Sequence, residues 1–199
     1  MRLRQRTIWL AVLCLLGLPG TGLLAHVTPP VVLLSERDAV LGMTSGATKF
    51  FVREVRLTSQ ERAAIEQQWR WRPEDELYRF YLGRDNAGSL VTAVIFLTEA
   101  TIHGPVRVAV GLGPDGAVKD ARVVELTEET FPWLQPLLDQ NFTRDYIGRG
   151  SQASFGLPER LGGATPNSMS QFYGQIVSSL IQRATVLFEV TVLKRGEKI

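Results

Sequence analysis

The chain has 199 residues, of which 45% are hydrophobic and 21% charged, the balance of a globular protein. Its net charge is only +2 and no basic stripe is interleaved with aromatic residues, which argues against nucleic-acid binding. The single cysteine, Cys14, lies in an N-terminal apolar run, so the rest of the chain has no disulfide, thiol catalyst, iron–sulfur cluster or zinc–thiolate site.

Residues 1–25 are predicted to be a signal peptide or a membrane anchor. Arginines at positions 2, 4 and 6 precede an apolar stretch from Ile8 to Ala25, an order that directs export and keeps the N-terminus in the cytoplasm. Cleavage after Ala25 would put Leu23 where a small residue is expected, and the stretch is just long enough to span a bilayer. Cleavage and retention therefore both stay open.

Residues 26–34, with Pro29-Pro30, are predicted to be a stiff extended spacer, and residues 35–199 to be one domain. Ser35 suits the cap of a short helix, and residues 50–57 alternate as a strand. The capping box Thr58-Ser59-Gln60-Glu61 then predicts a helix that ends near Trp69, with its tryptophans packed inward.

Strand patterns follow at residues 76–82, 90–98, 106–112 and 117–126. The last two flank Gly113-Pro114-Asp115-Gly116, a strong hairpin turn. Strands joined by such short turns must be antiparallel.

Residues 128–140 are predicted to form a helix that Pro132 and Pro136 interrupt. Apolar residues at three- and four-residue spacing predict a long amphipathic helix over 169–184. Residues 185–193 are rich in β-branched side chains and suit a final strand or a tail. Together these elements predict an α+β domain in which an antiparallel meander sheet packs with helices.

The segment just before the long helix carries the strongest functional signal. Residues 159–168 read Glu-Arg-Leu-Gly-Gly-Ala-Thr-Pro-Asn-Ser. The glycine pair allows close approach to a ligand, and a helix N-terminus attracts anions. Thr165 followed by Pro166 is also an ordinary helix start, and such caps outnumber phosphate sites.

The order of the motifs resembles the FMN-binding domain family of exported bacterial electron-transfer proteins. Its members include the covalently flavinylated subunits of ion-pumping NADH:quinone and ferredoxin-linked reductases. The resemblance covers roughly residues 35–180 and is carried by Leu57-Thr58-Ser59-Gln60-Glu61, His103-Gly104-Pro105-Val106, Asp115-Gly116-Ala117-Val118, Glu128-Glu129 and Gly162-Gly163-Ala164-Thr165.

The family motif is Asp-x-x-Ser/Thr-Gly-Ala-Thr, whose last threonine carries FMN as a phosphoester added by a flavin transferase. The resemblance therefore makes Thr165 the acceptor. The cofactor-binding residues that it implies are Glu159, Gly162, Gly163, Ala164 and Thr165, with Thr130 and Phe131 as ring contacts and His103 as a turn residue near the cofactor. The chain departs from the motif at Glu159, Gly162 and Asn167, where the family has Asp, Ser/Thr and Ser/Thr.

Three other patterns have competing interpretations. Ser45-Gly46-Ala47-Thr48 also reads Ser-Gly-Ala-Thr, but a strand follows it rather than a helix, so it lacks the dipole that would hold phosphate. His26 and His103 are too few for a strong metal site. Glu128 and Glu129 suit paired catalytic carboxylates or, more simply, the acidic start of a helix.

These observations predict an exported FMN-binding protein that passes electrons, an electron carrier or redox subunit rather than an enzyme with its own substrate. We expect it in the periplasm or on the outer face of the cytoplasmic membrane. Its expected partners are membrane electron-transfer proteins and a flavin transferase. The alternative, favoured by the three departures from the motif, is a flavin-free interaction or assembly module on the same fold.

Overall fold

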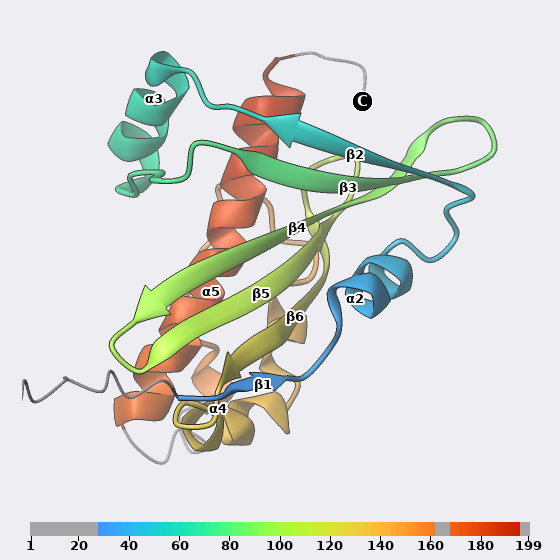
Figure 1. Ribbon diagram of the computed structural model, residues 1–199. Coiled ribbons are helices and arrows are strands. Elements are labelled where there is room, and N and C mark those ends of the chain that lie inside the picture. The colour runs from blue at the N-terminus through green and yellow to red at the C-terminus, as the bar shows by residue number, and fades with distance from the viewer. Residues whose placement is uncertain (1–27, 162–167, 196–199) are drawn as a thin grey trace, which may run out of the picture.

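The computed structural model describes residues 28–161 and 168–195, which fold as an α+β domain (Figure 1). Its six-stranded antiparallel sheet has the order β1-β6-β5-β4-β3-β2. The strands are β1 (Pro30–Val32), β2 (Lys49–Val55), β3 (Tyr78–Arg84), β4 (Leu90–Thr101), β5 (Gly104–Leu112) and β6 (Val118–Thr127). The helices are α2 (Glu36–Met43), α3 (Ser59–Trp69), α4 (Phe131–Leu138) and α5 (Ser168–Phe188), with short turns η1 (Phe142–Tyr146), η2 (Glu159–Leu161) and η3 (Glu189–Leu193).

Local signals in the sequence place the first two helices. Ser35 caps α2 by accepting a hydrogen bond from the Asp38 N–H at 3.1 Å. At the start of α3 the predicted capping box forms in both directions: Glu61 N–H donates to Thr58 Oγ1 at 3.2 Å, and Thr58 N–H donates to Glu61 Oε2 at 2.8 Å. Both helices therefore begin where side chains satisfy the free backbone N–H groups.

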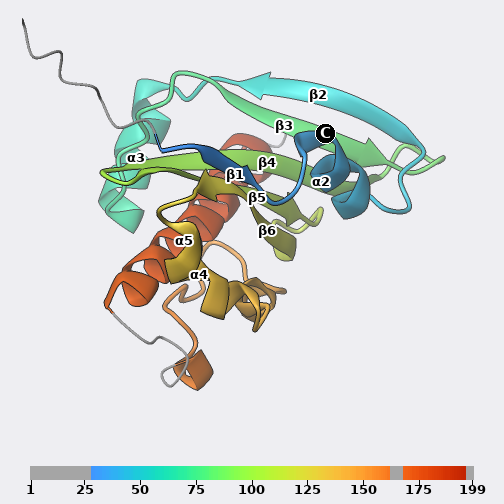
Figure 2. The same cartoon turned by 60° about the horizontal axis from the view of Figure 1, so that its bottom comes forward.

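The long helix α5 covers one face of the sheet, with α4 beside it on the same side (Figure 2). Its apolar face packs on the side chains that project from this face of the sheet, and together they form the main core. Fully buried members of this core include Phe80, Ile95, Val108, Leu112, Tyr173, Val177, Ile181 and Phe188.

The opposite face of the sheet is covered only in part, by the short helix α2. A small second cluster lies there, made of Ala39 and Met43 from α2 against Val94, Ala109 and Val124 from the central strands. The central strands are therefore buried on both faces, whereas β2 at one edge exposes most of its side chains.

By length and composition the segment 168–193 could cross a membrane, with a mean hydropathy of 1.5 in its most apolar window. In this domain 67% of that window is buried. Its hydrophobicity therefore serves the core.

The extended segment before the domain is not a free spacer. Pro30 to Val32 pair with β6 as an antiparallel edge strand, with Pro30 opposite Thr127. Proline is tolerated at a sheet edge because its missing N–H faces no partner there. The prediction for residues 26–34 was therefore wrong over β1, while the predictions for residues 1–25 lie outside the described residues.

Two further predictions also need correction, one of a strand or tail and one of an interrupted helix. Residues 185–193 are neither a strand nor a tail: α5 continues to Phe188 and passes into the π-helical turn η3, whose Val190 and Val192 are 5% and 2% exposed. Burial against the core outweighs the strand preference of these β-branched side chains. In α4, Pro132 lies in the first turn, where no N–H is needed, so it does not interrupt the helix.

Candidate functional site

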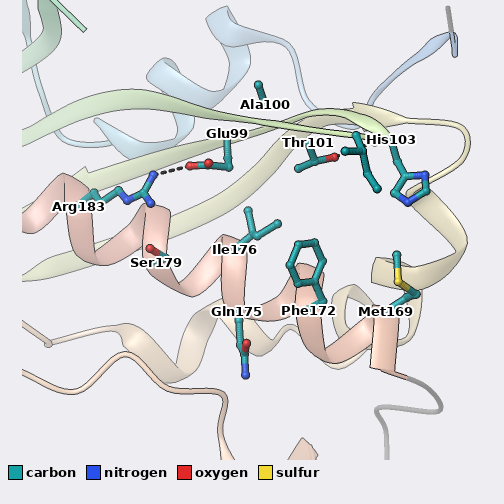
Figure 3. A pocket seen from close by; sticks show the side chains of 11 residues that line it. Glu99, Ala100, Thr101, His103, Met169, Phe172, Gln175, Ile176, Ser179 and Arg183 are labelled. Carbon is teal, nitrogen blue, oxygen red and sulfur yellow. Dashed lines mark hydrogen bonds and ion pairs between the residues drawn. The ribbon is translucent and has the colours of Figure 1, made fainter. Parts of the chain in front are cut away.

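A cavity of about 660 Å³ lies between the end of β4, the β4–β5 turn and the outer side of α5 (Figure 3). One wall is apolar and comes from α5, through Met169, Phe172 and Ile176. The other comes from the end of β4 and the turn, including Thr101 and His103. Ligand sites in proteins have this size and this mixture of apolar wall and few polar groups.

The turn that carries His103 is held rigidly by its own residues. Thr101 Oγ1 donates to Gly104 O at 2.7 Å and accepts from the His103 N–H at 3.2 Å. Its remaining contact is with the Tyr173 hydroxyl at 3.1 Å, so Tyr173 is the donor in that bond. Gly104 takes the left-handed conformation that the turn requires, with φ of 99°.

Two threonines, at the end of β6 and the start of α4, also support the turn. Thr127 Oγ1 donates to the His103 carbonyl at 2.7 Å and lies 3.1 Å from Thr130 Oγ1. Both threonines are buried. The position of the His103 backbone is therefore fixed by the end of β6 and the start of α4.

The His103 ring is oriented by a hydrogen bond and by aromatic contacts. Its Nδ1 lies 2.6 Å from Glu129 Oε1, so the Nδ1–H donates to the carboxylate. The ring meets Trp133 edge to face at 4.9 Å between centroids, and Trp133 in turn stacks on Tyr173 at 5.4 Å. Burial, with a smaller effect from the Glu129 charge, raises the pKa of Tyr173, which keeps this hydroxyl protonated.

The other end of the cavity is closed by an ion pair between Arg183 of α5 and Glu99 of β4 (Figure 3). The Arg183 guanidinium also lies over the Trp71 ring, 5.3 Å from its centroid. Arg183 is thus held by two partners, as His103 is at the near end.

The structure brings only some of the predicted site residues to this cavity. His103 lines it, whereas Thr130 is buried and does not, and its hydroxyl is bonded to Thr127. Phe131 lines a separate hollow of about 290 Å³ beside Leu33. Glu159 is exposed in η2. The residues of the motif itself, Gly162, Gly163, Ala164, Thr165 and Asn167, lie outside the described residues.

The competing patterns have structural outcomes as well. Thr48 lies at the entry to β2, where its N–H donates to Arg84 O at 2.7 Å, so Ser45-Gly46-Ala47-Thr48 precedes a strand as predicted. Glu128 and Glu129 occupy the turn before α4 rather than its first residues. Within residues 28–161 and 168–195, no three His, Cys, Asp or Glu side chains are grouped to hold a metal ion.

Sequence reasoning had missed the residues that position His103. Glu129 is 26 residues away, and Tyr173 is 70 residues away. The sequence singled out Glu129 only within the resemblance and as one of two adjacent carboxylates, and neither pattern related it to His103. No local pattern marks Thr101, although a threonine before a tight turn with glycine is a typical signal for side-chain bonding to the turn.

No family model, curated protein or solved structure matches the chain. The resemblance to the FMN-binding domain family therefore rests on the motif residues alone.

Proposed function

We propose that the protein is an exported FMN-binding protein that passes electrons, with the flavin in the cavity between the β4–β5 turn and α5. One observation carries the proposal: the cavity holds His103 in one wall and the first turns of α5 in the other. The Gly-Gly-Ala-Thr motif runs directly into that helix, and Thr165 precedes the lining residue Met169 by four positions in the sequence.

The lining of the cavity fits a flat, largely apolar ring system with polar edges. Phe172 is 49% exposed and offers its ring to the cavity, beside Met169 and Ile176. From Met169 to Arg183 the helix spans about 21 Å, at 1.5 Å per residue. A cavity of about 660 Å³ along that length accommodates an elongated ligand.

The phosphate of FMN needs a different partner. The two basic side chains among the described lining residues already have acidic partners, His103 with Glu129 and Arg183 with Glu99. Backbone N–H groups at the start of a helix bind phosphate without a cation. This supports the segment before α5, with Thr165, as the phosphate-binding part of the proposed site.

When bound, FMN would supply the electron-transfer chemistry. The chain would hold and orient it: Phe172 and Ile176 exclude water from the ring, and the bonded turn at Thr101 fixes His103 against the cavity. Export fits this role, because a cofactor tied to Thr165 cannot be lost outside the cytoplasm. The partners would be membrane electron-transfer proteins, with a flavin transferase for the attachment.

The test is to purify the full chain from its native host and to record its visible spectrum and intact mass. The expected result is a yellow protein whose intact mass exceeds that of the unmodified chain by one FMN less water. Thr165→Ala should abolish this increase. Phe172→Ala should weaken rebinding of free FMN about two- to tenfold, the worth of an aromatic contact. Phe51→Ala, an exposed ring on β2, should leave it unchanged.

A colourless protein that does not bind added FMN would refute the proposal. That result would favour the flavin-free interaction module on the same fold.

A further inference from the structure

We propose that the end of the domain formed by the β4–β5 turn and the start of α5 rests on the outer surface of the membrane in which residues 8–25 are anchored. This membrane-facing end is defined by Pro29, Ile102, Pro105, Met169 and Phe172. The inference rests on the proposed anchor and not on flavin, so a protein without FMN would leave it standing.

Chain connectivity brings this end close to the anchor. Glu128 N–H donates to Pro29 O at 3.0 Å, and Thr127 donates to the His103 carbonyl at 2.7 Å. The start of β1 and the β4–β5 turn therefore contact two successive residues where β6 ends. Figure 1 shows β1, the turn and the first turn of α5 at one end of the sheet.

Only four residues, 26–29, separate the apolar stretch from this point. Fully extended, four residues reach about 14 Å. The headgroup layer on each side of a bilayer is about 5–8 Å thick. If the stretch spans the bilayer, Pro29 must lie within about 10 Å of the headgroups, whatever the direction in which the chain leaves the membrane.

The side chains at this end are suited to that position. Ile102 is 95% exposed at the tip of a two-residue turn, a place where polar residues and glycine are usual. Phe172 is 49% exposed beside it, and both border the same cavity. Exposed apolar side chains that gather at one place commonly mark a membrane or protein contact.

The charges at this end identify the kind of contact. Glu128 and Glu129 are exposed there, and Glu129 is hydrogen-bonded to His103. With Glu128 acidic, attraction to anionic lipid cannot drive docking. The contact is therefore apolar, and we expect it on phosphatidylcholine at any salt concentration and to weaken as phosphatidylglycerol is added.

The test uses the full chain with Cys14→Ala, reconstituted in phosphatidylcholine nanodiscs. A fluorophore is attached at Pro105→Cys beside the turn or, as the matched control, at Ala87→Cys. Residue 87 is exposed in the β3–β4 turn at the other end of β4, a strand of 12 residues or about 36 Å. Lipids with a nitroxide on the headgroup should quench the label at 105 strongly and the label at 87 little.

Ile102→Glu should lower the ratio of docked to undocked protein, reported by the label at 105, about tenfold or more. This is the effect of losing one large apolar side chain from the interface. Val52→Glu changes a similarly exposed apolar residue on the edge strand β2 and should have no effect.

Equal quenching at 105 and 87, or an Ile102→Glu variant that docks like the parent, would overturn the inference. So would an intact mass showing that residues 1–25 are removed in the native host. Shielding of the label at 105 from aqueous iodide that grows with protein concentration would instead show a second copy at this end and would also overturn it. FMN content, measured on the samples that retain Ile102, tests the proposed function separately.

Discussion

The glycine in the His103 turn gives the sharpest test of the site's architecture. Gly104 has φ of 99°, and a Cβ added there would lie 2.4 Å from Thr127 Cγ2. Gly104→Ala therefore meets two separate penalties. The left-handed backbone costs about 1–2 kcal/mol for alanine, and crowding a buried methyl costs about 1–3 kcal/mol more.

A double-mutant cycle separates the two penalties. Thr127→Ser deletes the Cγ2 that would clash but retains the hydroxyl that donates to His103 O, and alone it costs about 1 kcal/mol. In that background Gly104→Ala should cost only the backbone strain. The coupling free energy should therefore be about 1–3 kcal/mol in favour of the double variant.

The assay is urea-induced unfolding of the purified protein, followed by circular dichroism. Gly88→Ala is the matched control: Gly88 has φ of 87° but no atom within 4 Å of the added Cβ, so it reports strain without crowding. The reasoning is refuted if the Gly104 and Thr127 changes add to within about 0.5 kcal/mol, or if Gly88→Ala costs as much as Gly104→Ala.

Three further predictions concern the supporting parts of the fold. The Arg195 guanidinium, bonded to both carboxylate oxygens at 2.7 Å, lowers the pKa of Glu61 from its usual 4.5 to about 2. The free energy of unfolding should therefore fall by about 1–2 kcal/mol as the pH falls from 4.5 to 2. Glu61→Gln should lose that stability already at pH 7 and show no such acid dependence. If its stability falls with pH as steeply as the parent's, this ion pair is not the source of the acid dependence. Burial, with the nearby Asp75 charge, raises the pKa of Tyr78 from 10.0 to about 12, so stability should fall between pH 10 and 12. Tyr78→Phe should abolish that alkaline loss. It should lower the free energy of unfolding by less than about 1 kcal/mol at pH 7, because the buried hydroxyl has no hydrogen-bond partner in the described part of the chain. A larger loss in urea-induced unfolding would show that the hydroxyl is bonded. Trp69→Phe removes the indole N–H that donates to the Ser151 carbonyl at 3.1 Å, and thermal unfolding should show a loss of about 0.5–1.5 kcal/mol; an unchanged midpoint would count against that bond.

The sequence predicted those parts of the fold that local chemistry determines. Thr58 and Glu61 form a capping box because both partners lie within one turn, and Gly116 supports a hairpin turn with φ of 80°. Five strands, β2 to β6, and the long helix appear in their periodicity. These signals involve neighbours in the chain, so a single sequence contains them.

What the sequence did not predict depends on distant partners. Pairing of Pro30 with Thr127 joins residues almost a hundred positions apart, and nothing near Pro30 indicates it. Residues 189–193 have a strand-like composition, but burial of Val190 and Val192 beside α5 keeps them helical.

The same limit applies to the site. His103 was identified from its place before a glycine, whereas its partners Glu129 and Trp133 become evident only when β6 and α4 are brought to the β4–β5 turn. Phe131 shows the converse: predicted as a ring contact, it lines the separate hollow that Leu33 also lines and not the cavity beside His103.

The position of α5 in the chain has a consequence for biosynthesis. The sheet is complete at residue 127, yet the helix that covers its apolar face begins only at residue 168. A nascent chain that ends before residue 168 leaves Phe80, Ile95 and Val108 without their covering helix. Stable folding must therefore wait until the residues of α5, through Phe188, have been synthesised.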